Sequence, residues 1–133
     1  MIAVDTSALL AIAFDEPERD MFMAALKSAD TTLISAATIV EAQMVVFRRR
    51  GDAGLQILRD ILNLPAFEIV PPDQAEIEIA HAALVTYGKG NGHPAQLNVG
   101  DLFSYALAKS RGVPLLFKGD DFGLTDVEVA VPQ

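Results

Sequence analysis

The stretch Ile2-Ala3-Val4-Asp5-Thr6-Ser7, followed by the apolar run Ala8–Phe14, decides the fold of this chain. The three apolar residues Ile2–Val4 predict a short buried strand, and the Ala- and Leu-rich segment Ser7–Phe14 favours a helix. Asp5 stands at the carboxyl end of the strand, where the helix begins. A buried strand that leads directly into a helix is typical of a parallel α/β fold.

The rest of the chain continues this alternation of strands and helices. Further strands are expected at Thr32–Ser35, Phe67–Val70, Leu115–Phe117 and Val127–Val131. Helices are expected from Pro17 onward and over Ala37–Arg50, Asp52–Leu64, Asp73–Tyr87 and Asp101–Ser110, with Gly51 and Gly112 ending two of them. We therefore expect one α/β domain over residues 1–133, a three-layer α/β/α sandwich with a short parallel sheet of four or five strands.

Composition limits the classes of protein that this chain can be. Hydrophobic residues make up 51% of the 133 residues, enough for a core, and the absence of cysteine excludes disulfides and thiolate zinc sites. The start resembles no signal peptide and no apolar run is long enough to span a membrane, so we expect a cytoplasmic protein. The net charge of −8 argues against a generic nucleic-acid binder, but it allows an enzyme that meets phosphate through a bound metal.

Four acidic residues fall where one edge of the sheet would gather them. Asp5 and Asp120 follow strands, Asp101 begins a helix, and Glu41 lies two turns into the helix after Thr32–Ser35. Ligands of open α/β sheets bind outside the carboxyl ends of the strands. Each acid alone also fits an ordinary role, as a helix cap, an exposed helix residue or a turn residue. Their common location favours a shared site.

Clustered carboxylates require a counter-cation, because like charges a few ångströms apart cannot all stay ionised. Mg²⁺, with Mn²⁺ as a substitute, fits a site of carboxylate oxygens and water. With no cysteine and only His81 and His93, zinc is disfavoured. Such a metal would activate water and neutralise charge on a phosphate.

Four segments resemble a known family when they are taken together and in order. They are Val4-Asp5-Thr6-Ser7-Ala8-Leu9, Ser35-Ala36-Ala37-Thr38-Ile39-Val40-Glu41-Ala42, Gly100-Asp101-Leu102-Phe103-Ser104-Tyr105-Ala106-Leu107-Ala108 and Leu115-Leu116-Phe117-Lys118-Gly119-Asp120-Asp121-Phe122. The chain is similar over nearly its whole length to PIN domains, and specifically to VapC-type toxin ribonucleases. The resemblance assigns Asp5, Glu41 and Asp101 to the first three acidic positions. It assigns Asp120 to the fourth, with Asp121 as the rival, and Thr6 or Ser7 to the accompanying hydroxyl.

The resemblance also implies an activity and partners. It implies an endoribonuclease that hydrolyses RNA phosphodiester bonds, with Asp5 and Asp101 as the principal metal ligands. It further implies a homodimer and a cognate antitoxin protein that blocks the site. Lys118, beside the site, is a candidate contact for a substrate phosphate, and the Gly- and Asn-rich segment Gly88–Gly100 is expected to be a mobile loop at one side of it.

Other functions remain as alternatives. A domain that kept the fold and the metal but not the reaction is the nearest one, and metal binding without RNA cleavage would favour it. An aspartyl-nucleophile phosphatase would need a second Asp where this chain has Ser7. A receiver-type signalling module would need a phospho-accepting Asp after a central strand, where Pro71-Pro72 follow Phe67–Val70.

Overall fold

The computed structural model describes residues 1–132, so only Gln133 of the expected domain lies outside it. Four parallel strands form one sheet in the order β3-β2-β1-β4. They are β1 (Ile2–Val4), β2 (Thr32–Ser35), β3 (Phe67–Val70) and β4 (Leu115–Leu116). In register, Ala3 pairs with Leu33 on one side and with Leu115 on the other. The parallel four-stranded sheet confirms the expected α/β class.

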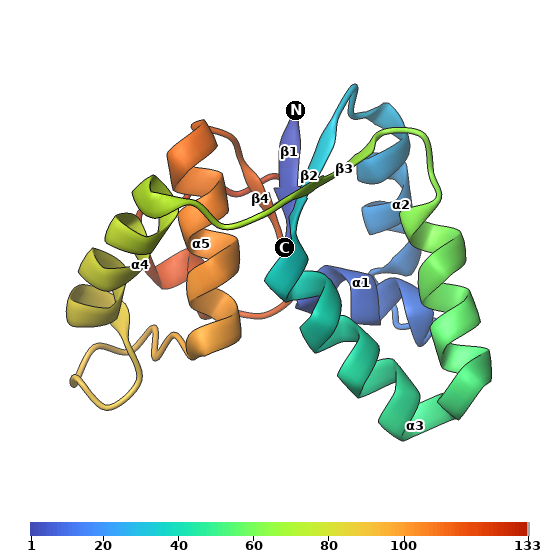
Figure 1. Cartoon of the computed structure of the whole chain (residues 1–133), viewed down its shortest axis with the longest axis horizontal. Helices are drawn as coiled ribbons and strands as arrows, with labels where there is room; N and C mark the ends of the chain where they lie inside the picture. The colour runs from blue at the N-terminus through green and yellow to red at the C-terminus, as the bar shows by residue number, and fades with distance from the viewer. Residues whose placement is uncertain (133) are drawn as a thin grey trace.

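Helices cover both faces of the sheet, which gives the three expected layers (Figure 1). One face carries α1 (Thr6–Ala13), α2 (Arg19–Ser28) and α3 (Ala36–Leu62), and the other carries α4 (Gln74–Tyr87) and α5 (Val99–Arg111). A short 3₁₀ turn, η1, spans Phe122–Leu124. No helix of residues 1–132 is long and apolar enough to cross a membrane.

The core is divided by the sheet into two apolar clusters, as the alternation of side chains along a strand requires. Val4, Ile34 and Leu116 point toward α1, α2 and α3, where Phe22 and Leu9 are fully buried. Their strand neighbours Ala3, Leu33 and Leu115 point to the other side and pack with Leu107 of α5 and the aromatic ring of Phe117. Every strand except β3 is thus buried on both faces, which fixes its position between the helix layers.

Two helix boundaries carry consequences for the site. Gly51 has φ 56° and ψ −141°, so α3 consists of two helical halves that meet at an angle there, as expected from the glycine. Helix α5 starts at Val99, two residues earlier than expected, because Asn98 caps it. The Asn98 side chain accepts from the Asp101 backbone N–H, and Asp101 accepts from the Asn98 N–H, which forms a capping box.

The expected fifth strand at Val127–Val131 is not formed. Only Val129 makes a parallel bridge, to Leu115, through two backbone hydrogen bonds that flank it. The partner strand β4 is two residues long, and Thr125 and Pro132 bracket the segment, so the ladder has no room to extend. The segment still closes the edge of the sheet beside β4.

Candidate active site

Asp5 lies buried at the carboxyl edge of the sheet, and both oxygens of its carboxylate accept hydrogen bonds. Asp5 ends β1 and is the N-cap of α1, and it is only 3% exposed. Its Oδ2 accepts hydrogen bonds from the Ser7 backbone N–H (3.0 Å) and the Ser7 hydroxyl (2.7 Å). Its Oδ1 accepts a hydrogen bond from the Ser104 hydroxyl at 2.5 Å. Asp5 therefore serves as a helix cap and also stands at the edge where a ligand would bind.

Glu41 reaches the same edge from the first half of α3. Thr6 donates to its Oε1 at 2.5 Å. A Cβ atom built at Gly100 would lie 2.0 Å from Oε2 of Glu41, a distance that no real side chain could occupy. Glycine at position 100 is thus required for the Glu41 carboxylate to lie against the first turn of α5, next to Asp101.

The surroundings of Asp101 change the pKa of its carboxyl group. Its pKa is raised from 3.8 to about 6, first by burial and then by the carboxylates of Asp5, Asp121 and Glu41, while the Asn98 N–H opposes the shift. An acid whose neutral form is favoured by like charges around it marks a place suited to a cation. Asp101 is therefore the electrostatic centre of the cluster.

The two adjacent acids after β4 lie in different surroundings. Asp121 is among the main charges that raise the pKa of Asp101. Asp120 instead lines a shallow depression together with Phe117, Leu124 and Val129. The arrangement of charge thus favours Asp121 over Asp120 as the fourth acid of the cluster.

Hydroxyl groups connect these acids. The Ser7 hydroxyl donates to Asp5 and accepts the Lys118 backbone N–H at 3.0 Å, which joins α1 to the end of β4. Thr6 also lies 3.4 Å from the carbonyl oxygen of Thr38. Both hydroxyl residues expected beside Asp5 therefore form hydrogen bonds with the acids: Thr6 donates to Glu41, and Ser7 donates to Asp5.

The Lys118 ammonium lies in an ion pair on the rim of the site. Its Nζ is 3.0 Å from Glu18 and 3.3 Å from Glu16, and these carboxylates, Glu18 first, raise its pKa. To contact a substrate phosphate, the ammonium would have to leave both glutamates. This pairing could not be predicted from local sequence, because Glu16 and Glu18 lie about a hundred residues away along the chain.

The acids lie near one another, but they are not arranged as the ligands of a bound metal ion. Within residues 1–132, no three acidic or histidine side chains lie close enough together to hold a metal ion as they stand. Asp5, Glu41 and Asp101 each accept a hydrogen bond from a different partner. The donor set nonetheless fits Mg²⁺ or Mn²⁺, since all the groups present are hard oxygen donors.

The segment between α4 and α5 is anchored at its base. Gly88 and Leu97 form a parallel bridge, and Ala95 and Leu97 are almost fully buried. His93 accepts the Ala95 N–H and packs edge-on against Tyr87, so it has a structural role in this segment. These contacts hold the base of the loop, whereas residues 90–92 at its tip are exposed. The mobility expected of Gly88–Gly100 stays a prediction.

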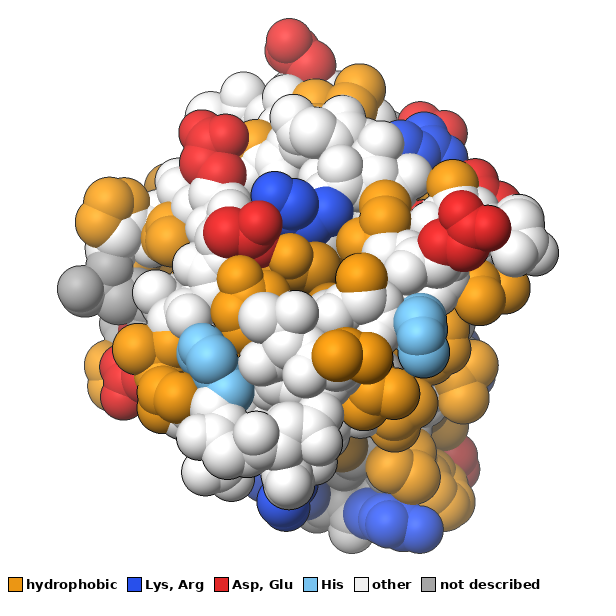
Figure 2. Space-filling model, turned by 90° about the vertical axis from the view of Figure 1, so that its left-hand side faces the viewer, with side chains coloured by type: hydrophobic (Ala, Val, Ile, Leu, Met, Phe, Trp, Pro, Cys, Tyr) orange, Lys and Arg blue, Asp and Glu red, His pale blue; other side chains and the backbone are white. Residues whose placement is uncertain are grey.

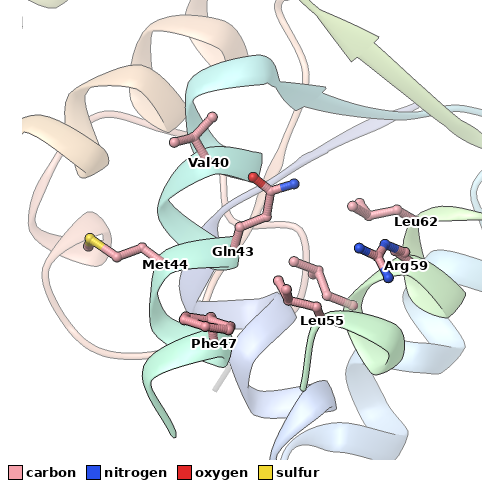
Figure 3. Close-up of a pocket in the computed structure, with 8 residues that line it drawn as sticks. Val40, Gln43, Met44, Phe47, Leu55, Arg59 and Leu62 are labelled. Atoms are coloured by element: carbon pink, nitrogen blue, oxygen red, sulfur yellow. The ribbon is translucent and has the colours of Figure 1, made fainter. Parts of the chain in front are cut away.

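Away from the acids, the angle in α3 creates an apolar groove. It is lined by Val40, Gln43, Met44, Phe47, Leu55, Leu58, Arg59 and Leu62. Figure 3 shows that these side chains come from both halves of α3 on either side of the bend. Phe47 is 54% exposed and Val40 is 64% exposed, which is unusual for such large apolar side chains.

Comparison with known proteins identifies relatives along the whole chain. The family model described as PIN domain matches residues 2–128. Ribonuclease VapC30 of Mycobacterium tuberculosis is 44% identical, over 98% of this chain and 100% of the relative. Ribonuclease VapC of Mycolicibacterium smegmatis is 42% identical, over 95% of this chain and 97% of the relative.

Solved structures share the fold at lower identity. Mycobacterium tuberculosis VapC20, described as a toxin that cleaves the sarcin-ricin loop, has a TM-score of 0.78 at 19% identity and is covered completely in both chains. VapBC2 from Rickettsia felis, bound to a DNA fragment from its promoter, has a TM-score of 0.74 at 17% identity, over 97% of this chain and 96% of the other. These structures support the three-layer architecture described above.

Proposed function

This chain belongs to the PIN-domain family as a VapC-type ribonuclease of toxin–antitoxin systems, and we propose that it hydrolyses RNA with Mg²⁺ or Mn²⁺ bound at Asp5 and Asp101. The observation that carries the proposal is the gathering of the Asp5, Asp121 and Glu41 carboxylates around the partly buried Asp101, where burial first and then these charges raise the pKa of Asp101 to about 6. Residues 1–133 act as one domain in this proposal.

Asp5, Asp101, Glu41 and Asp121 would hold the metal directly or through water, and we favour Asp121 over Asp120 for its effect on Asp101. Once bound, the metal would lower the pKa of a water molecule and neutralise charge that develops on the scissile phosphate. Ser7 keeps the Asp5 carboxylate at the edge of the sheet, and Thr6 orients Glu41. Gly100 leaves the space in which the Glu41 carboxylate lies.

The test of this proposal measures cleavage and metal binding in the same protein. RNA cleavage by the wild type should stop in EDTA and return with Mn²⁺. Asp5→Asn should bind Mn²⁺ more weakly and cleave RNA at least about a hundredfold more slowly, because the charge that binds the cation is reduced. Asp30→Asn, an exposed acid away from the site, serves as the control.

Two results would count against the proposal. Cleavage that persists in EDTA would remove the metal from the mechanism. Tight Mn²⁺ binding without cleavage of any RNA would favour the alternative of a catalytically silent PIN-like domain.

We propose that the groove in α3 binds an amphipathic segment of a cognate antitoxin. Solved structures of similar fold include toxin–antitoxin complexes, among them one from Klebsiella pneumoniae. The groove offers exposed apolar side chains to such a segment, and Arg59 offers a charge to an acidic residue on it. In this proposal, the antitoxin binds the groove in the cytoplasm, where RNA and newly made antitoxin are both present.

We further propose a homodimer through the outer face of α4. Ile77, Leu84 and Val85 are 56%, 44% and 64% exposed there. Figure 2 looks onto the α4 side and shows apolar side chains spread across this face between the charged ones. Apolar patches of this kind usually mark an interface. A monomeric mass at micromolar concentration without antitoxin would contradict the dimer.

A further inference from the structure

Ser104 lies directly behind Asp5, on the side away from solvent. It is on α5, three residues after Asp101, so the two side chains lie on the same face of the helix. Ser104 is 1% exposed, and its hydroxyl donates to Oδ1 of Asp5 at 2.5 Å. This hydrogen bond joins the end of β1 to α5 across 99 positions of sequence.

The hydrogen bonds of Asp5 leave only part of its carboxylate available. An ionised carboxylate has about four lone-pair positions, two on each oxygen. Oδ2 accepts two hydrogen bonds from Ser7, and Oδ1 accepts one from Ser104. Oδ1 therefore keeps a position that can face a cation. Without Ser104, only Oδ2 of Asp5 would accept hydrogen bonds, both from Ser7, and Oδ1 would have no hydrogen bond to hold it.

The Ser104 hydroxyl is itself part of a buried chain. Thr38 Oγ1 lies 3.4 Å from Ser104 Oγ. Since the Ser104 proton is directed to Asp5, Thr38 is the donor in this contact. Thr6, which donates to Glu41, also lies against the carbonyl oxygen of Thr38. Buried hydroxyls linked in this way polarise one another and hold their acceptors in place.

We propose that Ser104 is a positioning residue that fixes Oδ1 of Asp5 in the orientation in which it binds a divalent cation. The proposal rests on the metal-dependent function proposed above. An alanine at this buried position would fill nearly the same space, so packing alone does not explain the hydroxyl. Partners that hold a metal-binding side chain typically change metal affinity by about 10- to 100-fold when they are removed.

The experiment titrates Mn²⁺ into the protein by calorimetry, without RNA. Ser104→Ala removes the donor, and Ser104→Cys keeps a similar volume with a much weaker donor. We expect the Kd for Mn²⁺ to rise about tenfold in both variants. Ser110→Ala, on the same helix and partly exposed, should bind Mn²⁺ as the wild type does. Melting temperatures in EDTA report separately on the fold.

The outcomes separate this inference from the function on which it rests. Wild-type affinity, or tighter binding, in both Ser104 variants would overturn it, even if their melting temperatures in EDTA fell. Failure of both variants to fold would also overturn it, because a positioning hydroxyl is not needed for folding. No Mn²⁺ binding by the wild type would overturn the proposed function instead.

Discussion

In the metal-free protein at neutral pH, replacing Asp101 by asparagine is expected to stabilise the fold. Burial first, and then the charges of Asp5, Asp121 and Glu41, raise the pKa of Asp101 from 3.8 to about 6. The folded state therefore holds the proton more tightly than the unfolded state. The cost of ionising Asp101 in the folded state is nearly absent below pH 3.8, grows between pH 3.8 and about 6, and is constant above that.

The expected gain in stability of Asp101→Asn follows from the raised pKa of Asp101. A shift of about two pKa units corresponds to about 3 kcal/mol at most. Asp101 is partly exposed, so screening by solvent reduces this to about 1–2 kcal/mol. Asparagine can still accept the Asn98 N–H, although it loses about 0.5 kcal/mol of favourable interaction with the helix dipole. The net gain of about 1 kcal/mol raises Tm by about 3–5 °C for a chain of this size.

The assay is thermal unfolding in EDTA at pH 7.5 and pH 4, repeated with saturating Mn²⁺. Asp101→Asn should melt above the wild type at pH 7.5, and this advantage should vanish at pH 4. With Mn²⁺ the order should reverse, because only the wild type gains stability from binding. Asp30→Asn should match the wild type throughout. A lower Tm for Asp101→Asn at both pH values would refute the argument from charge.

In the metal-free protein, Asp5→Asn is expected to lower Tm, in contrast to Asp101→Asn. Asp5 accepts three hydrogen bonds from Ser7 and Ser104, and an amide has only one oxygen with which to accept them. Clustered negative charge alone would suggest that removing either acid relieves repulsion. The three hydrogen bonds stabilise the Asp5 carboxylate where it lies, whereas burial and the neighbouring carboxylates disfavour the charge of Asp101.

Three further predictions follow from the site and the loop. Asp121→Asn should reduce RNA cleavage by at least about tenfold more than Asp120→Asn, because Asp121 is among the main charges that act on Asp101; equal kinetics for the pair would contradict this. Gly100→Ala should raise helix propensity yet lower both Mn²⁺ affinity and cleavage, because the new Cβ displaces the Glu41 carboxylate, and unchanged affinity would show that Glu41 is dispensable. In hydrogen exchange, residues 90–92 should exchange quickly while the Leu97 N–H, bonded to the Tyr87 carbonyl, stays protected; uniform protection would contradict a mobile tip.

The fold and the location of the site were predictable because buried strands leave strong local signals. Ile2–Val4 and Thr32–Ser35 are short apolar or β-branched runs, and the acids that follow them fall at one edge by the geometry of a parallel sheet. The strand at Val127–Val131 was predicted wrongly, since its pattern is right but its partner β4 is too short to pair with it. Whether a segment forms a strand depends on the length of the strand beside it, and the segment's own sequence does not show that length.

Finer features of the site depended on contacts between distant residues. Asp120 and Asp121 are adjacent in sequence, and the turn after β4 places Asp121 where its charge acts on Asp101 and Asp120 where it lines a depression. Ser104 was missed because one serine in an apolar helix gives no sign of its partner. Its spacing of three residues from Asp101 was the available signal, since it places both on one helix face. Gly100 was interpreted as a loop residue and proved to be a spacer for Glu41.

The pairing of Lys118 with Glu16 and Glu18 has a consequence for how ionic strength affects RNA binding. A protein that neutralises many phosphates with free lysines releases condensed counterions, and its affinity then falls steeply as monovalent salt rises. Here the Lys118 ammonium on the rim of the site is already paired with two carboxylates of the protein itself, and the chain carries a net charge of −8. The affinity of this enzyme for RNA should therefore depend weakly on potassium chloride and strongly on the concentration of free divalent cation.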